Sequence, residues 1–105
     1  MIEVTKEPEK FPLGQLVATR AIAAALDPEV VTALVRRHES GDWGELDSSD
    51  KEANDRAVGS GERILSHYTV GIAPLSLFEL TESASVYVIT EWDRSVTTVL
   101  FSGEY

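Results

Sequence analysis

The chain has 105 residues with a formal net charge of −9, from 18 acidic and 9 basic side chains, and 43% of its residues are hydrophobic. This length and composition predict one domain whose core needs no metal or disulfide. The absence of cysteine excludes disulfide scaffolds, thiolate zinc sites and cysteine nucleophiles, and the scattered basic residues argue against direct binding to nucleic acid.

The first residues are polar and are interrupted by Pro8 and Pro12. This pattern predicts a flexible N-terminal arm over residues 1–12 and a single α+β domain over residues 13–105. The start of the chain lacks the unbroken apolar region of a signal peptide. The longest apolar run, residues 21–26, is far shorter than the ~20 residues that cross a bilayer. We therefore expect a cytoplasmic protein that does not contact membranes.

A short strand is expected over residues 14–19, followed by an alanine-rich helical turn over residues 20–26. Asp27 and Pro28 then mark a helix start, because Asp caps free N–H groups and Pro fits the first helical position. The apolar residues that follow recur at helical spacing and predict one buried stripe, formed by Val30, Val31, Leu34 and Val35. The helix ends before Gly41, with cations in its last turn: Arg36, Arg37 and His38.

A second helix begins at Asp47, where the sequence Asp47-Ser48-Ser49-Asp50 resembles a capping box, and it ends in the glycine-containing segment 59–61. Three β-branched and aromatic segments follow, over residues 62–72, 86–90 and 96–101. In the first of them, one face is predicted to carry Ile64, Ser66, Tyr68 and Val70. The fold class is therefore α+β: a short N-terminal strand, two helices and then a three-stranded antiparallel β-meander.

The two histidines, His38 and His67, have no neighbours that make a recognisable catalytic unit. The sequence contains no nucleophile elbow and no glycine-rich phosphate loop. We interpret His38 as a cation at the end of a helix and His67 as a half-exposed strand residue. We expect no catalytic residue, no metal and no cofactor.

The most distinctive feature is an acidic run over residues 39–55, with seven acids, one base and a local net charge of −6. Its spacing does not fit a calcium loop, and it lacks the lysine and distal carboxylates of a magnesium nuclease site. Two interpretations stay open: a solvated helix start, where Asp and Glu are favoured, or an acidic surface that docks a basic protein. The candidate surface consists of Glu39, Asp42, Glu45, Asp47, Asp50, Glu52 and Asp55.

Two tryptophans complete the candidate binding surface. Trp43 lies between glycines within the acidic run, either buried between the helices and the sheet or exposed as a binding anchor. We favour burial, because large aromatic side chains dominate the cores of small domains. Trp92 lies at a predicted hairpin tip between Glu91 and Asp93, where we expect exposure.

Several segments match a family pattern in the same order: residues 13–19, with the sequence Leu-Gly-Gln-Leu-Val-Ala-Thr, residues 41–47, residues 89–95, Thr97-Thr98 and Glu104-Tyr105. With them the chain resembles a small, functionally uncharacterised family of bacterial proteins found on plasmids, integrative elements and phages, some of which carry a label linking them to type I restriction. The arm before Leu13 and the apolar segment 73–85 depart from that pattern. The resemblance implies a protein of a mobile genetic element. Nothing in the chain resembles a methyltransferase, so we do not expect that activity.

We therefore expect a non-enzymatic acidic interaction protein of a mobile genetic element, acting on a protein partner with a basic surface. Inhibition of a host defence nuclease, of the anti-CRISPR or anti-restriction type, is the role that this hypothesis favours. One alternative is a small metal-dependent hydrolase or nuclease that uses His38, Asp42, Glu45 and Asp47. Another is a homodimeric structural module, in which an open sheet edge pairs between copies.

Overall fold

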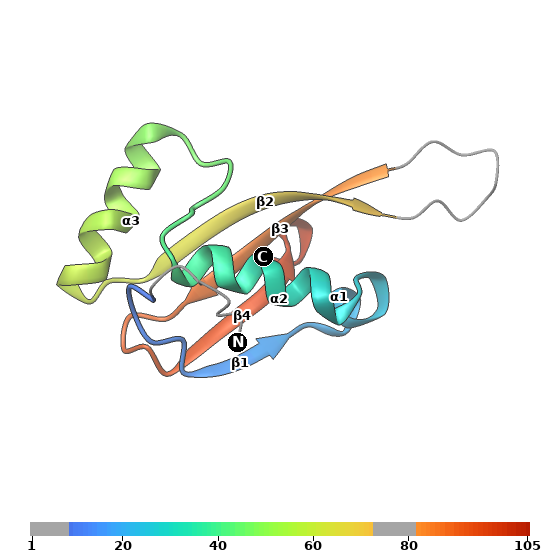
Figure 1. The fold of residues 1–105 in the computed structure, drawn as a ribbon, viewed down its shortest axis with the longest axis horizontal. Coiled ribbons are helices and arrows are strands. Elements are labelled where there is room, and N and C mark those ends of the chain that lie inside the picture. Colours follow the sequence, from blue (N-terminus) through green and yellow to red (C-terminus); the bar gives the residue numbers. More distant parts are fainter. Residues whose placement is uncertain (1–8, 73–81) are drawn as a thin grey trace, which may run out of the picture.

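The computed structural model describes residues 9–72 and 82–105 (Figure 1). In chain order the elements are β1 (Gln15–Ala18), α1 (Arg20–Ala25), α2 (Pro28–Glu39), α3 (Ser48–Ser60), β2 (Ile64–Ile72), β3 (Glu82–Thr90), β4 (Val96–Phe101) and the 3-10 turn η1 (Ser102–Glu104). Of the apolar segment 73–85 singled out in the sequence, residues 73–81 lie outside the described residues, and residues 82–85 belong to β3.

The four strands form one mixed sheet in the order β1-β4-β3-β2. β2, β3 and β4 pair antiparallel, whereas β1 pairs parallel to β4. The α+β class is confirmed, but the predicted layout was incomplete: the first strand joins the sheet and makes it mixed, and the described residues form three helices rather than two. A strand can pair parallel to another only when a crossover connection carries the chain back across the sheet. Here the helices after β1 provide that crossover, so β1 can join the sheet parallel to β4.

The main core lies between one face of the sheet and the helices α1 and α2, which cross that face (Figure 1). Side chains along a strand alternate between faces, so every second residue points at the helices. The predicted stripe of Ile64, Ser66, Tyr68 and Val70 is buried, with Tyr68 and Val70 in this main core. From α2 the buried apolar residues are Leu34 and Val35, while Val30 of the predicted stripe is 36% exposed.

A second, smaller core lies under α3 and includes part of the predicted N-terminal arm. Phe11 is buried with Trp43, Ala57 and Ile64, and its ring stacks on that of Trp43 at 6.0 Å between centroids. The N–H of Lys10 donates to the Glu39 carbonyl at the end of α2. Two residues at the end of the predicted arm, Lys10 and Phe11, therefore contact the domain.

The opposite face of the sheet carries a row of rings instead of helices. His67 contacts Tyr87 edge-on at 5.3 Å, and Tyr87 contacts Tyr105 in the same way at 5.8 Å. The guanidinium of Arg63 lies over the Tyr105 ring and donates to its hydroxyl at 2.5 Å. Glu104, in η1, accepts from Thr19 and from its own turn, so the C-terminal residues fold back onto this face.

Candidate functional site

The acidic segment leaves the end of α2 and runs along the open edge of β2 before α3 begins. The N–H of Glu45 donates to the His67 carbonyl at 2.7 Å, and the N–H of His67 donates to the Trp43 carbonyl at 3.2 Å. This exchange is a parallel bridge between Gly44 and His67. One step along β2, the side-chain amide of Asn54 in α3 donates to the Leu65 carbonyl and accepts from its N–H.

Asp42, the second acid of the run, is neutralised by a neighbour. Its carboxylate accepts from Arg37 at 2.7 and 3.2 Å and from the N–H of Gly44. The hydrogen bond from Arg37 lowers the pKa of Asp42 below its usual value, and the same bond raises the pKa of Arg37. Because both side chains are about half exposed, this pair contributes only a few tenths of a kcal/mol to about 1 kcal/mol.

Three other acids of the run also accept hydrogen bonds from within the chain. Asp47 caps α3, where its carboxylate accepts from the N–H of Asp50 at 2.8 Å, as the capping box predicts. Asp55 accepts from the indole N–H of Trp43 at 2.9 Å, and Glu45 accepts from the hydroxyl of Thr69. Each of these three carboxylates therefore accepts a hydrogen bond from within the chain, while the residues themselves stay exposed.

The first acid of the run is withdrawn from the surface. Glu39 is 8% exposed at the end of α2. Four exposed acids lie at the start of α3 and in the segment just before it, and we call these residues the α3 acidic surface: Glu45, Asp47, Asp50 and Glu52. Lys51 is the one base among them.

The two tryptophans lie in different environments. Trp43 is 3% exposed, as the favoured interpretation predicted, so its ring is not available to a partner. Trp92 is 67% exposed in the β3–β4 hairpin, which confirms its predicted exposure. The next residues of this hairpin hold the far end of α3, since Arg94 donates to the Ala57 carbonyl at 2.7 Å. Because Ala57 lies seven residues after Asp50, about 10 Å along the helix axis, this hairpin meets α3 away from the α3 acidic surface.

His38 is not the helix-end cation that the sequence suggested; its ring is fully buried within a chain of hydroxyl groups. Thr97 donates to the Leu13 carbonyl at 2.7 Å, so its hydroxyl must accept from Thr90 at 2.6 Å. Thr90 must then accept from His38 Nε2 at 2.8 Å. The ring proton therefore sits on Nε2, and Nδ1 accepts from Ser66 at 2.5 Å.

Burial is the main reason that the pKa of His38 falls to about 3, and the positive charge of Arg94 lowers it further. Phe11 and Trp43 close the ring in by edge contacts at 5.2 and 5.9 Å. A neutral histidine with both nitrogens bonded and no solvent access joins α2 to three strands. It cannot reach a substrate.

The residues of the alternative enzyme hypothesis are not brought together. His38 is enclosed, Asp42 is paired with Arg37, and Asp47 is bound to the backbone of its own helix. Within residues 9–72 and 82–105, no three histidine or acidic side chains gather closely enough to hold a metal ion. His67 lies partly buried in β2, as predicted, and no described group bonds its Nε2.

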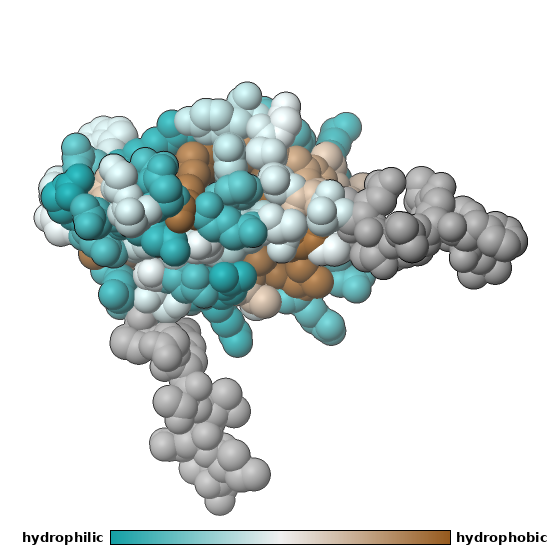
Figure 2. Space-filling view, turned by 90° about the horizontal axis from the view of Figure 1, so that it is seen from above, coloured by the Kyte–Doolittle hydropathy of each residue, from teal (hydrophilic) through white to brown (hydrophobic). Residues whose placement is uncertain are grey.

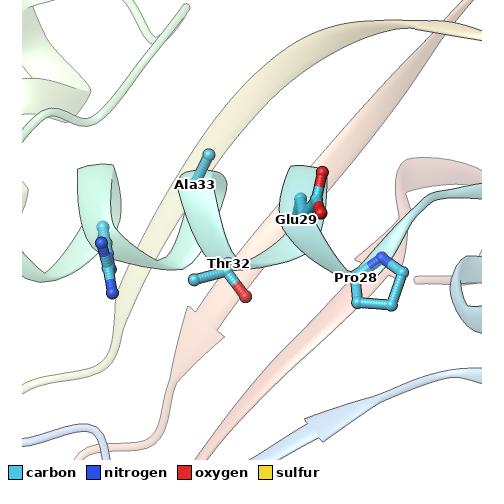
Figure 3. Close-up of a pocket in the computed structure, with 5 residues that line it drawn as sticks. Pro28, Glu29, Thr32 and Ala33 are labelled. Carbon is cyan, nitrogen blue, oxygen red and sulfur yellow. The ribbon is translucent and has the colours of Figure 1, made fainter.

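Hollows on the surface of the described residues include one on α2 and one between α3 and β2. The larger, of ≈ 420 Å³, follows the outer side of α2 beside Pro28, Glu29, Thr32 and Ala33 (Figure 3). The smaller, of ≈ 240 Å³, lies between α3 and β2 and touches the α3 acidic surface, with a lining of Leu46, Asp50, Ala53, Asn54 and Leu65. We call it the α3–β2 hollow. No pattern in the sequence predicts this hollow, because its apolar lining comes from separate segments.

Seen from above, the surface is largely hydrophilic, with hydrophobic atoms confined to small patches (Figure 2). No helix in the described part of the chain is long and apolar enough to cross a membrane. Comparison with protein-family models, curated proteins and solved structures returns no match. The resemblance to proteins of mobile elements therefore stays a prediction.

Proposed function

We propose that this protein acts by binding a basic protein partner, without catalysis, through the α3 acidic surface. The chain carries a net charge of −9, and the exposed acids Asp50 and Glu52 lie in the first turns of α3 with Glu45 and Asp47 beside them. A surface of this kind attracts a cationic partner at long range and raises the rate at which the two proteins associate.

The single observation that carries the proposal is the α3–β2 hollow beside these acids. Its apolar lining, from Leu46, Ala53 and Leu65, is bordered by the carboxylate-bearing residue Asp50. Lysine and arginine bury an aliphatic stem while keeping a charged head in a polar environment. An apolar hollow with an acidic rim suits that combination, so we infer that one lysine or arginine of the partner inserts here.

The partner that fits best is a protein whose basic groove normally holds nucleic acid. Acidic side chains can occupy such a groove in place of phosphates, because both neutralise the same lysine and arginine residues. With the resemblance to proteins of mobile elements, this favours a host defence nuclease as the target, and inhibition of the anti-CRISPR or anti-restriction type as the outcome.

A charge-reversal comparison tests this proposal. The variant D50K/E52K reverses two acids of the α3 acidic surface, and D27K/E29K makes the same change at the start of α2. Tagged protein captures partners from bacterial host lysate, and the affinity of each purified partner is then measured at 50 to 300 mM NaCl. We expect D50K/E52K to weaken binding at least tenfold and D27K/E29K less than threefold, with affinity falling as salt rises.

A second variant tests the hollow itself. A53F fills it with a ring while leaving the charge unchanged, and A21F places the same ring at an exposed alanine of α1. A53F should lower the affinity for the partner, and A21F should not. Equal losses in the two charge variants, salt-independent affinity, or full binding by A53F would each contradict the proposal.

A further inference from the structure

The strand β1 forms one edge of the sheet, and half of its backbone groups face away from the sheet. The N–H of Gln15 donates to the Ser95 carbonyl at 2.9 Å, and that of Thr19 donates to the Val99 carbonyl at 3.1 Å. Backbone groups alternate in direction along a strand. The N–H and C=O groups of Leu16 and Ala18 therefore point outward, at the edge opposite β2 in the sheet order.

Within the described residues, this edge lacks most of the usual protections against pairing with another strand, although at four residues it is short. Natural edges are blocked by lysine, proline, a bulge or a covering segment. β1 contains no charge and no proline, and each of its residues is exposed. Its apolar side chains are among the most exposed of the described residues, at 50% for Leu16 and 38% for Val17.

The charge distribution indicates what can pair here. Residues 11–26 contain one charged side chain, Arg20, in a chain with 18 acids and 9 bases. A second copy of the chain carries the same net charge of −9 and is repelled from most of the surface. Along β1 this repulsion is weakest, because the strand itself is neutral and the charges that flank its end, Arg20 and the Glu104 carboxylate on Thr19, are of opposite sign.

We propose that β1 pairs antiparallel with β1 of a second copy across a two-fold axis at Val17. In this register Leu16 lies opposite Ala18 of the second copy, and the two residues exchange both backbone hydrogen bonds. The outward-facing residues of one strand then meet those of the other. The two four-stranded sheets become one continuous sheet, and no group that β4 already binds has to move.

The side chains agree with this register. Leu16 and Ala18 align with Thr97 and Val99, which face the helices, so they extend the helix-covered side across the axis. Val17 aligns with Thr98 on the opposite face and meets its own symmetry mate. Because β1 and α3 lie at opposite edges of the sheet, this pairing leaves the α3 acidic surface free, and the inference does not depend on the proposed function.

Sedimentation equilibrium over a wide range of protein concentrations tests the proposal with three variants. L16K places a charge on the edge. V30K places the same charge at an exposed valine of α2, and both substitutions move the net charge from −9 to −8. A18P removes one outward N–H without a charge. We expect the wild type and V30K to dimerise alike, and L16K and A18P to weaken the dimer at least tenfold.

Hydrogen exchange locates the contact. As concentration rises, the amides of Leu16 and Ala18 should become protected, whereas those of Gln15 and Thr19 are protected at every concentration. A wild type that stays monomeric overturns the proposal. A V30K dimer as weak as that of L16K also overturns it. The same holds if the amide protection of Leu16 and Ala18 does not change with protein concentration. If circular dichroism shows that A18P does not fold, the comparison of dimer affinity between L16K and V30K tests the proposal.

Discussion

His38 shows how one residue can organise the interior. Its ring accepts a hydrogen bond from Ser66 on β2 and donates one to Thr90 on β3, and the chain of hydrogen bonds continues through Thr97 on β4 to the Leu13 carbonyl. Without this network, each of these buried polar groups would lack a hydrogen-bond partner, which costs about 1–3 kcal/mol of folding free energy per group. The network therefore fixes how α2 sits on the sheet.

The buried imidazole makes stability depend on pH. The pKa of His38 is about 3 in the folded chain and near its ordinary 6.5 when unfolded, so the unfolded chain binds a proton that the folded chain does not. The contribution of His38 is therefore fully present above pH 6.5 and is lost as pH falls toward 3. At pH 5 we expect a loss of about 2 kcal/mol relative to pH 7.5.

Urea unfolding of the wild type and H38Q at pH 5, 6 and 7.5 measures this effect. H38Q should be less stable at pH 7.5, but the difference between the two proteins should shrink by about 2 kcal/mol at pH 5. H67Q is the control, because His67 lies at the partly buried bridge to Gly44, outside the His38 network. A constant difference between wild type and H38Q would show that His38 takes up its proton equally in the folded and unfolded chains, which would contradict its burial as the cause of the pH dependence.

At this scale the sequence predicted some environments and missed others. The size of Trp43 and the flanks of Trp92 indicated burial of the first and exposure of the second, as observed. The last-turn position of His38 indicated a solvated cation. Sequence position cannot show that its partners Ser66 and Thr90, 28 and 52 residues away, meet it in the core.

At the scale of elements, the segment 41–46 acts as an extra partner for β2. Gly44 adopts a positive φ of 76°, and a β-carbon there would overlap the His67 carbonyl oxygen and lie 2.7 Å from the Tyr68 ring. Only glycine lets the two backbones approach so closely. The segment thus blocks the open edge of β2 and places Glu45 and Asp47 beside α3.

Two alanine substitutions of glycine should change stability in opposite directions. We expect G44A to destabilise the fold by about 3 kcal/mol, from the overlap and the left-handed backbone. Gly59 lies within α3 and nothing lies within 4 Å of its β-carbon position, so G59A should stabilise the fold by about 0.5–1 kcal/mol. Urea unfolding measures both, and a destabilised G59A or a neutral G44A would refute this account of the segment.

Local signals predicted most element boundaries and few pairings. Asp27 with Pro28, and Asp47 with Asp50, gave the two long helices to within a residue or two at their starts. The alternation in β2 placed its buried face correctly. The parallel pairing of β1 with β4 was missed, because it joins segments about eighty residues apart and leaves no local pattern.

At the scale of the whole molecule, charge and apolar surface are separated. The acids of the α3 acidic surface lie beside β2, and the neutral residues of β1 lie at the other edge of the sheet. The ion pairs Arg37–Asp42 and Arg63–Glu91 lie at exposed side chains and contribute little stability. Salt that screens these two attractions therefore costs the fold little. The remaining acidic excess is repulsive, and screening it should stabilise the fold.

Thermal unfolding in sodium chloride tests this balance. Between 20 and 300 mM we expect the wild-type Tm to rise by a few degrees, about the shift that 0.5–1 kcal/mol produces in a domain of this size. E29K/E52K changes two exposed acids and moves the net charge from −9 to −5, so its Tm should start higher and rise less with salt. E29D/E52D keeps the charge and should behave like the wild type. A wild-type Tm that falls with salt would mean that attraction between charges outweighs repulsion. In that case the acids of this chain would be bound to its own bases rather than free to meet a partner.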